Sequence, residues 1–158
     1  MAAYEFLTTW CLDAPIERVY EVLREARDYP RWWPSARSVE VLAEGDERGV
    51  GQVDRYTWRS ALPYSVRFDA CVTRVEGPHL IEATVTGDLE GRGAWRLFEG
   101  RGTAVVFEWR VRTTPTWMNV LGPVARPAFV WNHDRVMAAG GAGLARELGV
   151  ALLASSHR

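Results

Sequence analysis

The chain has 158 residues, of which 47% are hydrophobic, so it can bury the core of one domain without help from metals or disulfides. Its 19 basic residues, all of them arginine, nearly balance its 20 acidic residues, which argues against a nucleic-acid-binding surface. Because lysine is absent, a P-loop and lysine Schiff-base chemistry are excluded.

Cysteine and histidine usage argues against a metal centre. Cys11 and Cys71 lie in apolar, strand-like runs without a CxxC partner, and the three histidines are scattered along the sequence.

The N-terminus lacks the pattern of a signal peptide, and no apolar window has the length of a membrane span. We therefore expect a cytoplasmic protein without a metal or another cofactor and without integral membrane association.

The first third of the chain predicts one strand and two short helices. Residues 4–12 mix β-branched, aromatic and aliphatic side chains, which favours a strand. A helix follows over residues 16–23, where apolar side chains recur at helical spacing. Residues 28–34 contain two prolines and the adjacent Trp32 and Trp33, which indicates a short helical turn at a rim. Either at least one face of a tryptophan is exposed there, or Trp32 closes the open end of the sheet.

Residues 39–113 show period-two alternation interrupted by glycine-containing turns. The interruptions delimit six strands, the clearest of which places Phe107 and Trp109 on one face and Glu108 and Arg110 on the other. Short connections make consecutive strands neighbours, so we expect an antiparallel meander with one face in water.

Residues 117–149 predict one long helix with an apolar stripe that includes Phe129, Val130, His133 and Met137. Glycines at positions 140, 141 and 143 each cost about 1 kcal/mol relative to alanine in a helix. We interpret them as the place where the helix approaches the sheet closely. The prediction is a single domain over residues 1–150, followed by a frayed tail over residues 151–158.

Two motifs carry a resemblance to a known family. The run Ala14-Pro15-Ile16-Glu17-Arg18-Val19-Tyr20 after a strand, and the run Tyr29-Pro30-Arg31-Trp32-Trp33-Pro34, resemble markers of the START-like SRPBCC superfamily, and most closely its polyketide cyclase/dehydrase branch. The resemblance implies an α+β helix-grip fold. In this fold, a curved, seven-stranded antiparallel sheet wraps around a long C-terminal helix, two short helices lie between strands one and two, and a hydrophobic cavity separates sheet from helix.

The side chains expected at such a cavity are mostly aromatic, because a pocket for a flat ligand needs large apolar walls. The candidate ligand-binding residues are Trp32, Trp33, Tyr56, Trp58, Phe68, Trp95, Phe107, Trp109, Phe129, Val130, His133 and Met137. The candidate acid-base groups are His133, Tyr56 and Tyr64. Each has a structural alternative, as a core residue or as a histidine bonded to a neighbour, and Asp54 and Arg55 are expected to be exposed.

Three functions remain open at this point. The first is binding of a small hydrophobic molecule that is aromatic, polyketide-like or lipid-like. The second is a cyclase or dehydratase that acts on a polyketide-like substrate by acid-base catalysis. The third is a quinone or lipid chaperone. The sequence does not indicate an oligomeric state.

Overall fold

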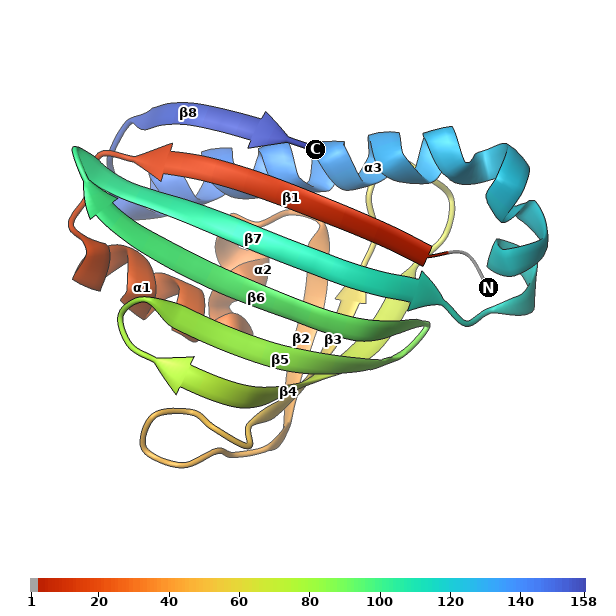
Figure 1. Cartoon of the computed structure of the whole chain (residues 1–158), viewed down its shortest axis with the longest axis horizontal. Helices are drawn as coiled ribbons and strands as arrows, with labels where there is room; N and C mark the ends of the chain where they lie inside the picture. The colour runs from red at the N-terminus through yellow and green to blue at the C-terminus, as the bar shows by residue number, and fades with distance from the viewer. Residues whose placement is uncertain (1–2) are drawn as a thin grey trace.

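The computed structural model describes residues 3–158 as a sheet, a long helix and a group of short helices (Figure 1). In chain order the elements are β1 (Ala3–Leu12), α1 (Ile16–Arg24), the 3-10 helix η1 (Ala26–Asp28), α2 (Tyr29–Trp32), β2 (Ala36–Ala43), β3 (Val53–Trp58), β4 (Val66–Glu76), β5 (Leu80–Gly87), β6 (Leu89–Gly100), β7 (Gly102–Thr113), α3 (Thr116–Leu148) and β8 (Leu152–His157).

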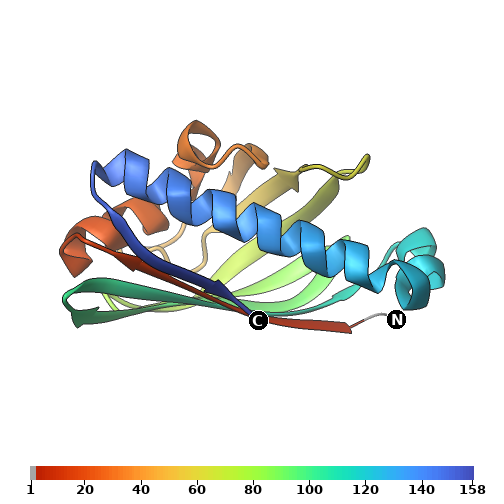
Figure 2. The same cartoon turned by 90° about the horizontal axis from the view of Figure 1, so that it is seen from above.

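The strands form one antiparallel sheet in the order β2-β3-β4-β5-β6-β7-β1-β8. The predicted meander is confirmed for β2 to β7, and β1 crosses back to pair with β7. The sheet curves, and α3 lies across its concave face (Figure 2). Most apolar residues of the strands face this helix and most charged residues face outward, as the period of two predicts. The α+β helix-grip fold is therefore confirmed.

The tail is the one element whose structure was predicted wrongly. Residues 152–157 are not frayed but form β8, which pairs with β1 and raises the strand count from seven to eight. Backbone hydrogen bonds also join Leu7 and Arg158 in both directions, at 3.0 and 2.9 Å. The segment is short, its four middle residues are exposed and it shows no period-two alternation, so its sequence does not predict a strand.

The long helix α3 begins and ends one residue earlier than the predicted range of 117–149. Gly149 ends it in the left-handed conformation, at a φ of 68°, which glycine adopts without steric cost. Figure 1 shows the first turns of α3 bent away from the rest, and Pro123 and Pro127 lie in this part of the helix. Proline lacks the N–H of the helical ladder and its ring crowds the preceding turn, which accounts for the bend.

The glycines of α3 do allow a close approach, and the groups approached belong largely to tryptophans. A Cβ atom on Gly140 or Gly141 would collide with the indole ring of Trp33 or Trp10, and one on Gly143 with the backbone oxygen of Trp32. The C-terminal half of α3 therefore packs directly on β1 and α2. In addition, Arg18 of α1 donates a 2.8 Å hydrogen bond to the Leu148 carbonyl, which ties down the end of the helix.

Candidate functional site

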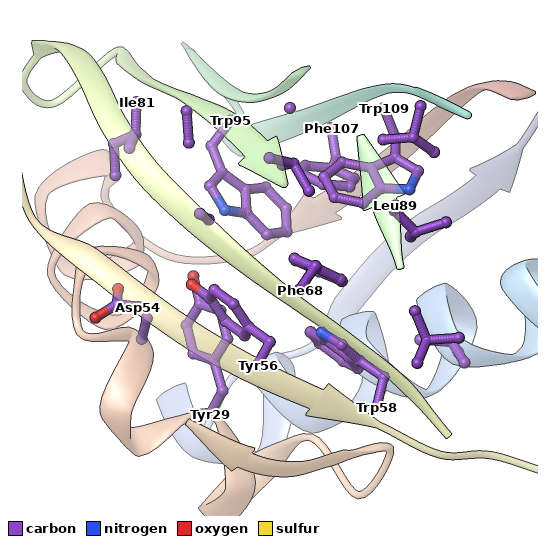
Figure 3. Close-up of a pocket in the computed structure, with 18 of the residues that line it drawn as sticks. Tyr29, Asp54, Tyr56, Trp58, Phe68, Ile81, Leu89, Trp95, Phe107 and Trp109 are labelled. Atoms are coloured by element: carbon purple, nitrogen blue, oxygen red, sulfur yellow. The ribbon is translucent and has the colours of Figure 1, made fainter. Parts of the chain in front are cut away.

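A cavity of about 260 Å³ lies between the concave face of the sheet and α3. Strands β3 to β7 supply about half of the residues that line it, and the neighbouring rings contact one another (Figure 3). Trp95 and Phe107 lie 4.3 Å apart between ring centroids, and Phe68 and Trp109 lie 5.4 Å apart. Because the sheet curves beneath α3, the rings on its concave face do not fill the whole distance to the helix, and a space bounded by aromatic faces remains.

Most candidate residues from the sequence meet at this cavity. All of them except Trp32 and Val130 line it, including the three candidate acid-base groups. The lining candidates are Trp33, Tyr56, Trp58, Tyr64, Phe68, Trp95, Phe107, Trp109, Phe129, His133 and Met137. The strand candidates come together because period-two alternation sends them to one face.

Neither Trp32, the last residue of α2, nor Trp33, which follows it, has the exposed face that was predicted for one of them. Trp32 and Trp33 retain only 4% and 2% of their surface in water, and their rings stack at 5.4 Å. Both fit under α3 because the glycines of that helix leave room for them. Trp33 also donates a 2.8 Å hydrogen bond from its indole nitrogen to the Val136 carbonyl. The pair is thus a core element, of which only Trp33 reaches the cavity.

His133 is strongly perturbed by its burial at the cavity. Its ring stacks on Phe6 at 3.8 Å, and its Nδ1 atom is buried without a hydrogen-bond partner in the described residues. Desolvation and, to a lesser degree, the neighbouring His157 lower the pKa of the imidazole to about 3. Nδ1 also lies 3.9 Å from Asp134 Oδ1, too far for a hydrogen bond. The ring is therefore neutral near pH 7 and does not form an ion pair with Asp134.

The pKa values of the candidate tyrosines at the cavity are raised further above the neutral range. Desolvation raises the pKa of Tyr64 to about 12 and raises the pKa of Tyr56 well above its ordinary value, with smaller contributions to Tyr56 from Tyr29 and Asp54. Each phenol therefore holds its proton at neutral pH. Such groups donate and accept hydrogen bonds but are poor bases.

Asp54 is the residue most clearly misjudged from the sequence. It was expected to be exposed, yet it is 3% exposed and lines the cavity, whereas Arg55 points outward as expected and pairs with Asp69 at 2.8 Å. The signal for this was present, because Asp54 is two residues before Tyr56 and therefore shares its face. Tyr29, which also lines the cavity, was not predicted because its helix is too short to show a periodic pattern.

Residues 3–158 contain neither a metal-binding cluster nor a helix that could span a membrane. No cluster of three or more histidine, cysteine, aspartate or glutamate side chains is arranged to hold a metal ion. None of the described helices combines the length and the apolar character needed to cross a membrane.

Comparison with solved structures shows the same fold at low identity. The Zhui aromatase/cyclase from Streptomyces sp. R1128 matches with a TM-score of 0.73 and 20% identity, over 94% of this chain and 94% of that one. A START superfamily protein from Mycobacterium smegmatis matches with a TM-score of 0.73 and 13% identity, over 92% and 98%. The di-domain aromatase/cyclase BexL from the BE-7585A pathway matches with a TM-score of 0.69 and 21% identity, over 91% of this chain and 49% of that one.

Sequence comparison identifies the family directly. No curated protein matches the sequence. The family model described as polyketide cyclase / dehydrase and lipid transport matches residues 7–149, which is nearly the whole chain. The resemblance carried by the two N-terminal motifs is thereby confirmed. The chain belongs to the polyketide cyclase/dehydrase and lipid transport family.

Proposed function

We propose that this protein binds one small, flat, hydrophobic molecule in the cavity between the sheet and α3. The observation that carries the proposal is the wall itself, which is built from aromatic rings and interrupted by few polar groups. Such a wall offers stacking and edge contacts to a ring system in addition to the burial of apolar area, which is worth roughly 25 cal/mol per Å².

The size of the cavity restricts the ligand. Its volume of about 260 Å³ lies just below the range of roughly 300–1,000 Å³ that is usual for ligand pockets. A compound of a few fused rings suits this space better than a long acyl chain. Of the lipid-like ligands, a quinone ring is therefore the better match, and quinone or lipid carriage is a narrower form of the same proposal.

The electrostatics of the site support binding over acid-base catalysis. Because the pKa of His133 is lowered to about 3 and that of Tyr64 is raised to about 12, neither group is poised to exchange a proton at neutral pH. A cyclase or dehydratase is the second candidate, supported by family membership and by the access of His133, Tyr56 and Tyr64 to the cavity. Loss of turnover of a polyketide-like substrate in single variants of these residues would support the second candidate.

Binding is tested by filling the cavity. Ala83 lines it from β5, while the next residue, Thr84, points to the outer face and is exposed. We expect β-naphthol to bind the wild type and the Thr84→Phe control in isothermal titration calorimetry, and Ala83→Phe to lose at least tenfold in affinity. Circular dichroism checks that both variants are folded. Equal affinity in all three proteins, or no binding to the wild type, would contradict the proposal.

A further inference from the structure

The buried carboxyl group of Asp54 has few stabilising partners in the protein. Its two oxygens accept hydrogen bonds of 3.0 and 3.1 Å from a single amide nitrogen, Nε2 of Gln52. Within residues 3–158 no arginine forms an ion pair with it, in contrast to Asp69, whose carboxylate is held by Arg55. Burying a charge without a counter-ion costs free energy. A carboxylate at this position therefore calls for a role other than stabilising the fold.

Asp54 lies beside two tyrosines that differ in whether the protein itself binds their hydroxyl groups. Figure 3 shows the hydroxyls of Tyr29 and Tyr56 reaching the same region, with Trp95 above them and Asp54 next to them. The Tyr29 hydroxyl donates its proton to the Leu23 carbonyl, so this donor is already used within the protein. For the Tyr56 hydroxyl, the described part of the chain provides no hydrogen bond. At this end of the cavity, Asp54 and Tyr56 therefore have hydrogen-bonding capacity that the described residues do not use.

The two groups complement a hydroxyl. An ionised carboxylate only accepts hydrogen bonds, whereas a tyrosine hydroxyl can donate one, and a ligand hydroxyl both donates and accepts. A charged ligand group is less suited to this end of the cavity. Arg24 and Arg48 line it and would oppose a cation, while Asp54 and Glu25 would oppose an anion.

We propose that Asp54 and Tyr56 form the polar subsite of the cavity and recognise the hydroxyl of a phenolic or enolic ring system. Asp54 accepts the hydroxyl proton in a hydrogen bond, and Tyr56 donates to the hydroxyl oxygen. The rings of the ligand then extend along the aromatic wall toward Phe68 and Trp109. This inference rests on the proposed binding function and adds to it the chemical class of the ligand.

The test compares β-naphthol with its methyl ether, which keeps the rings but cannot donate a hydrogen bond. Hydrogen bonds to charged groups typically contribute 1.5–3 kcal/mol, so the wild type should prefer the naphthol by about tenfold or more. We expect the preference to fall below about threefold in Asp54→Leu and to be reduced in Asp54→Asn and Tyr56→Phe. The control Asp69→Asn removes a carboxylate from the outer face and should keep the wild-type ratio.

The outcomes separate this inference from the function on which it rests. If wild type binds both compounds equally well, or if the preference survives in both Asp54 variants, the subsite is refuted while binding stands. If neither compound binds the wild type, the proposed function fails and the subsite with it. As a further readout, burial raises the pKa of the Asp54 carboxyl, so the naphthol preference should weaken on acidification and Asp54→Leu should show no such dependence.

Discussion

The pH dependence of stability provides a direct test of how His133 is buried. The structure holds its imidazole neutral, with the pKa lowered to about 3, while an unfolded histidine has an ordinary pKa of about 6.5. Below pH 6.5 the unfolded chain therefore binds a proton that the native protein does not, and native stability falls as the pH falls toward 3. Between pH 7.5 and pH 5 this linkage amounts to about 2 kcal/mol for a single group.

Replacing the imidazole by a ring that cannot titrate should remove this loss. In His133→Phe the new ring can still stack on Phe6, which the imidazole contacts at 3.8 Å. Urea unfolding followed by tryptophan fluorescence at several pH values gives the free energy of unfolding for both proteins. Relative to the wild type, the variant should gain about 2 kcal/mol on going from pH 7.5 to pH 5.

The experiment is controlled by the unchanged neighbours of His133 and by a second histidine variant. Asp134 and His157, the ionisable neighbours of His133, remain in the variant, so the two proteins differ only at position 133. His79, which lies in the turn before β5 and whose Nδ1 contacts the Leu97 carbonyl at 3.1 Å, supplies the matched variant His79→Phe. The reasoning is refuted if the His133→Phe and wild-type profiles run parallel, or if His79→Phe changes the profile as much.

Further predictions concern packing and buried polar groups. Gly140→Leu should lower stability by about 1–3 kcal/mol because its side chain meets the indole of Trp33, yet change β-naphthol affinity less than His133→Ala does, as urea unfolding and calorimetry can compare. Asp54→Asn should raise the melting temperature at pH 7, because burial raises the pKa of this carboxyl; the gain should shrink as acid protonates Asp54 in the wild type. Thr103→Val should cost about 1–2 kcal/mol in urea unfolding, since it removes the buried 2.7 Å hydrogen bond to the Ala14 carbonyl.

The sequence predicted the architecture well because the architecture depends on long periodic segments. Period-two alternation over β4 to β7 and helical spacing in α3 each span many residues, so single exceptions do not obscure them. The resemblance carried by the two N-terminal motifs then implied how these elements pack, with the sheet curved around the long helix. What could not be predicted was pairing between distant segments, and β8 is the clearest case, because six residues carry too little pattern to indicate a strand.

The sequence allowed us to predict most of the residues that line the cavity, but not how deeply each residue is buried. Alternation assigns Phe68 and Trp109 to the inner face, yet it does not show that α3 has glycines where Trp32 and Trp33 need space. Those two tryptophans were placed at an exposed rim for that reason. Asp54 illustrates a second limit, because a charged residue is usually taken to be exposed even where its spacing from Tyr56 predicts the opposite.

The position of β1 within the sheet has a consequence for how the chain folds during synthesis. Strands β2 to β7 can pair with their immediate successors as they leave the ribosome. By contrast, β1 is made first but pairs only with β7 and β8, about a hundred or more residues later. Closure of such long loops is slow, so β1 remains without partners while most of the sheet assembles. An apolar first strand, with Trp10 and Leu12 fully buried at the end, then depends on early protection from aggregation until the last part of the described chain is complete.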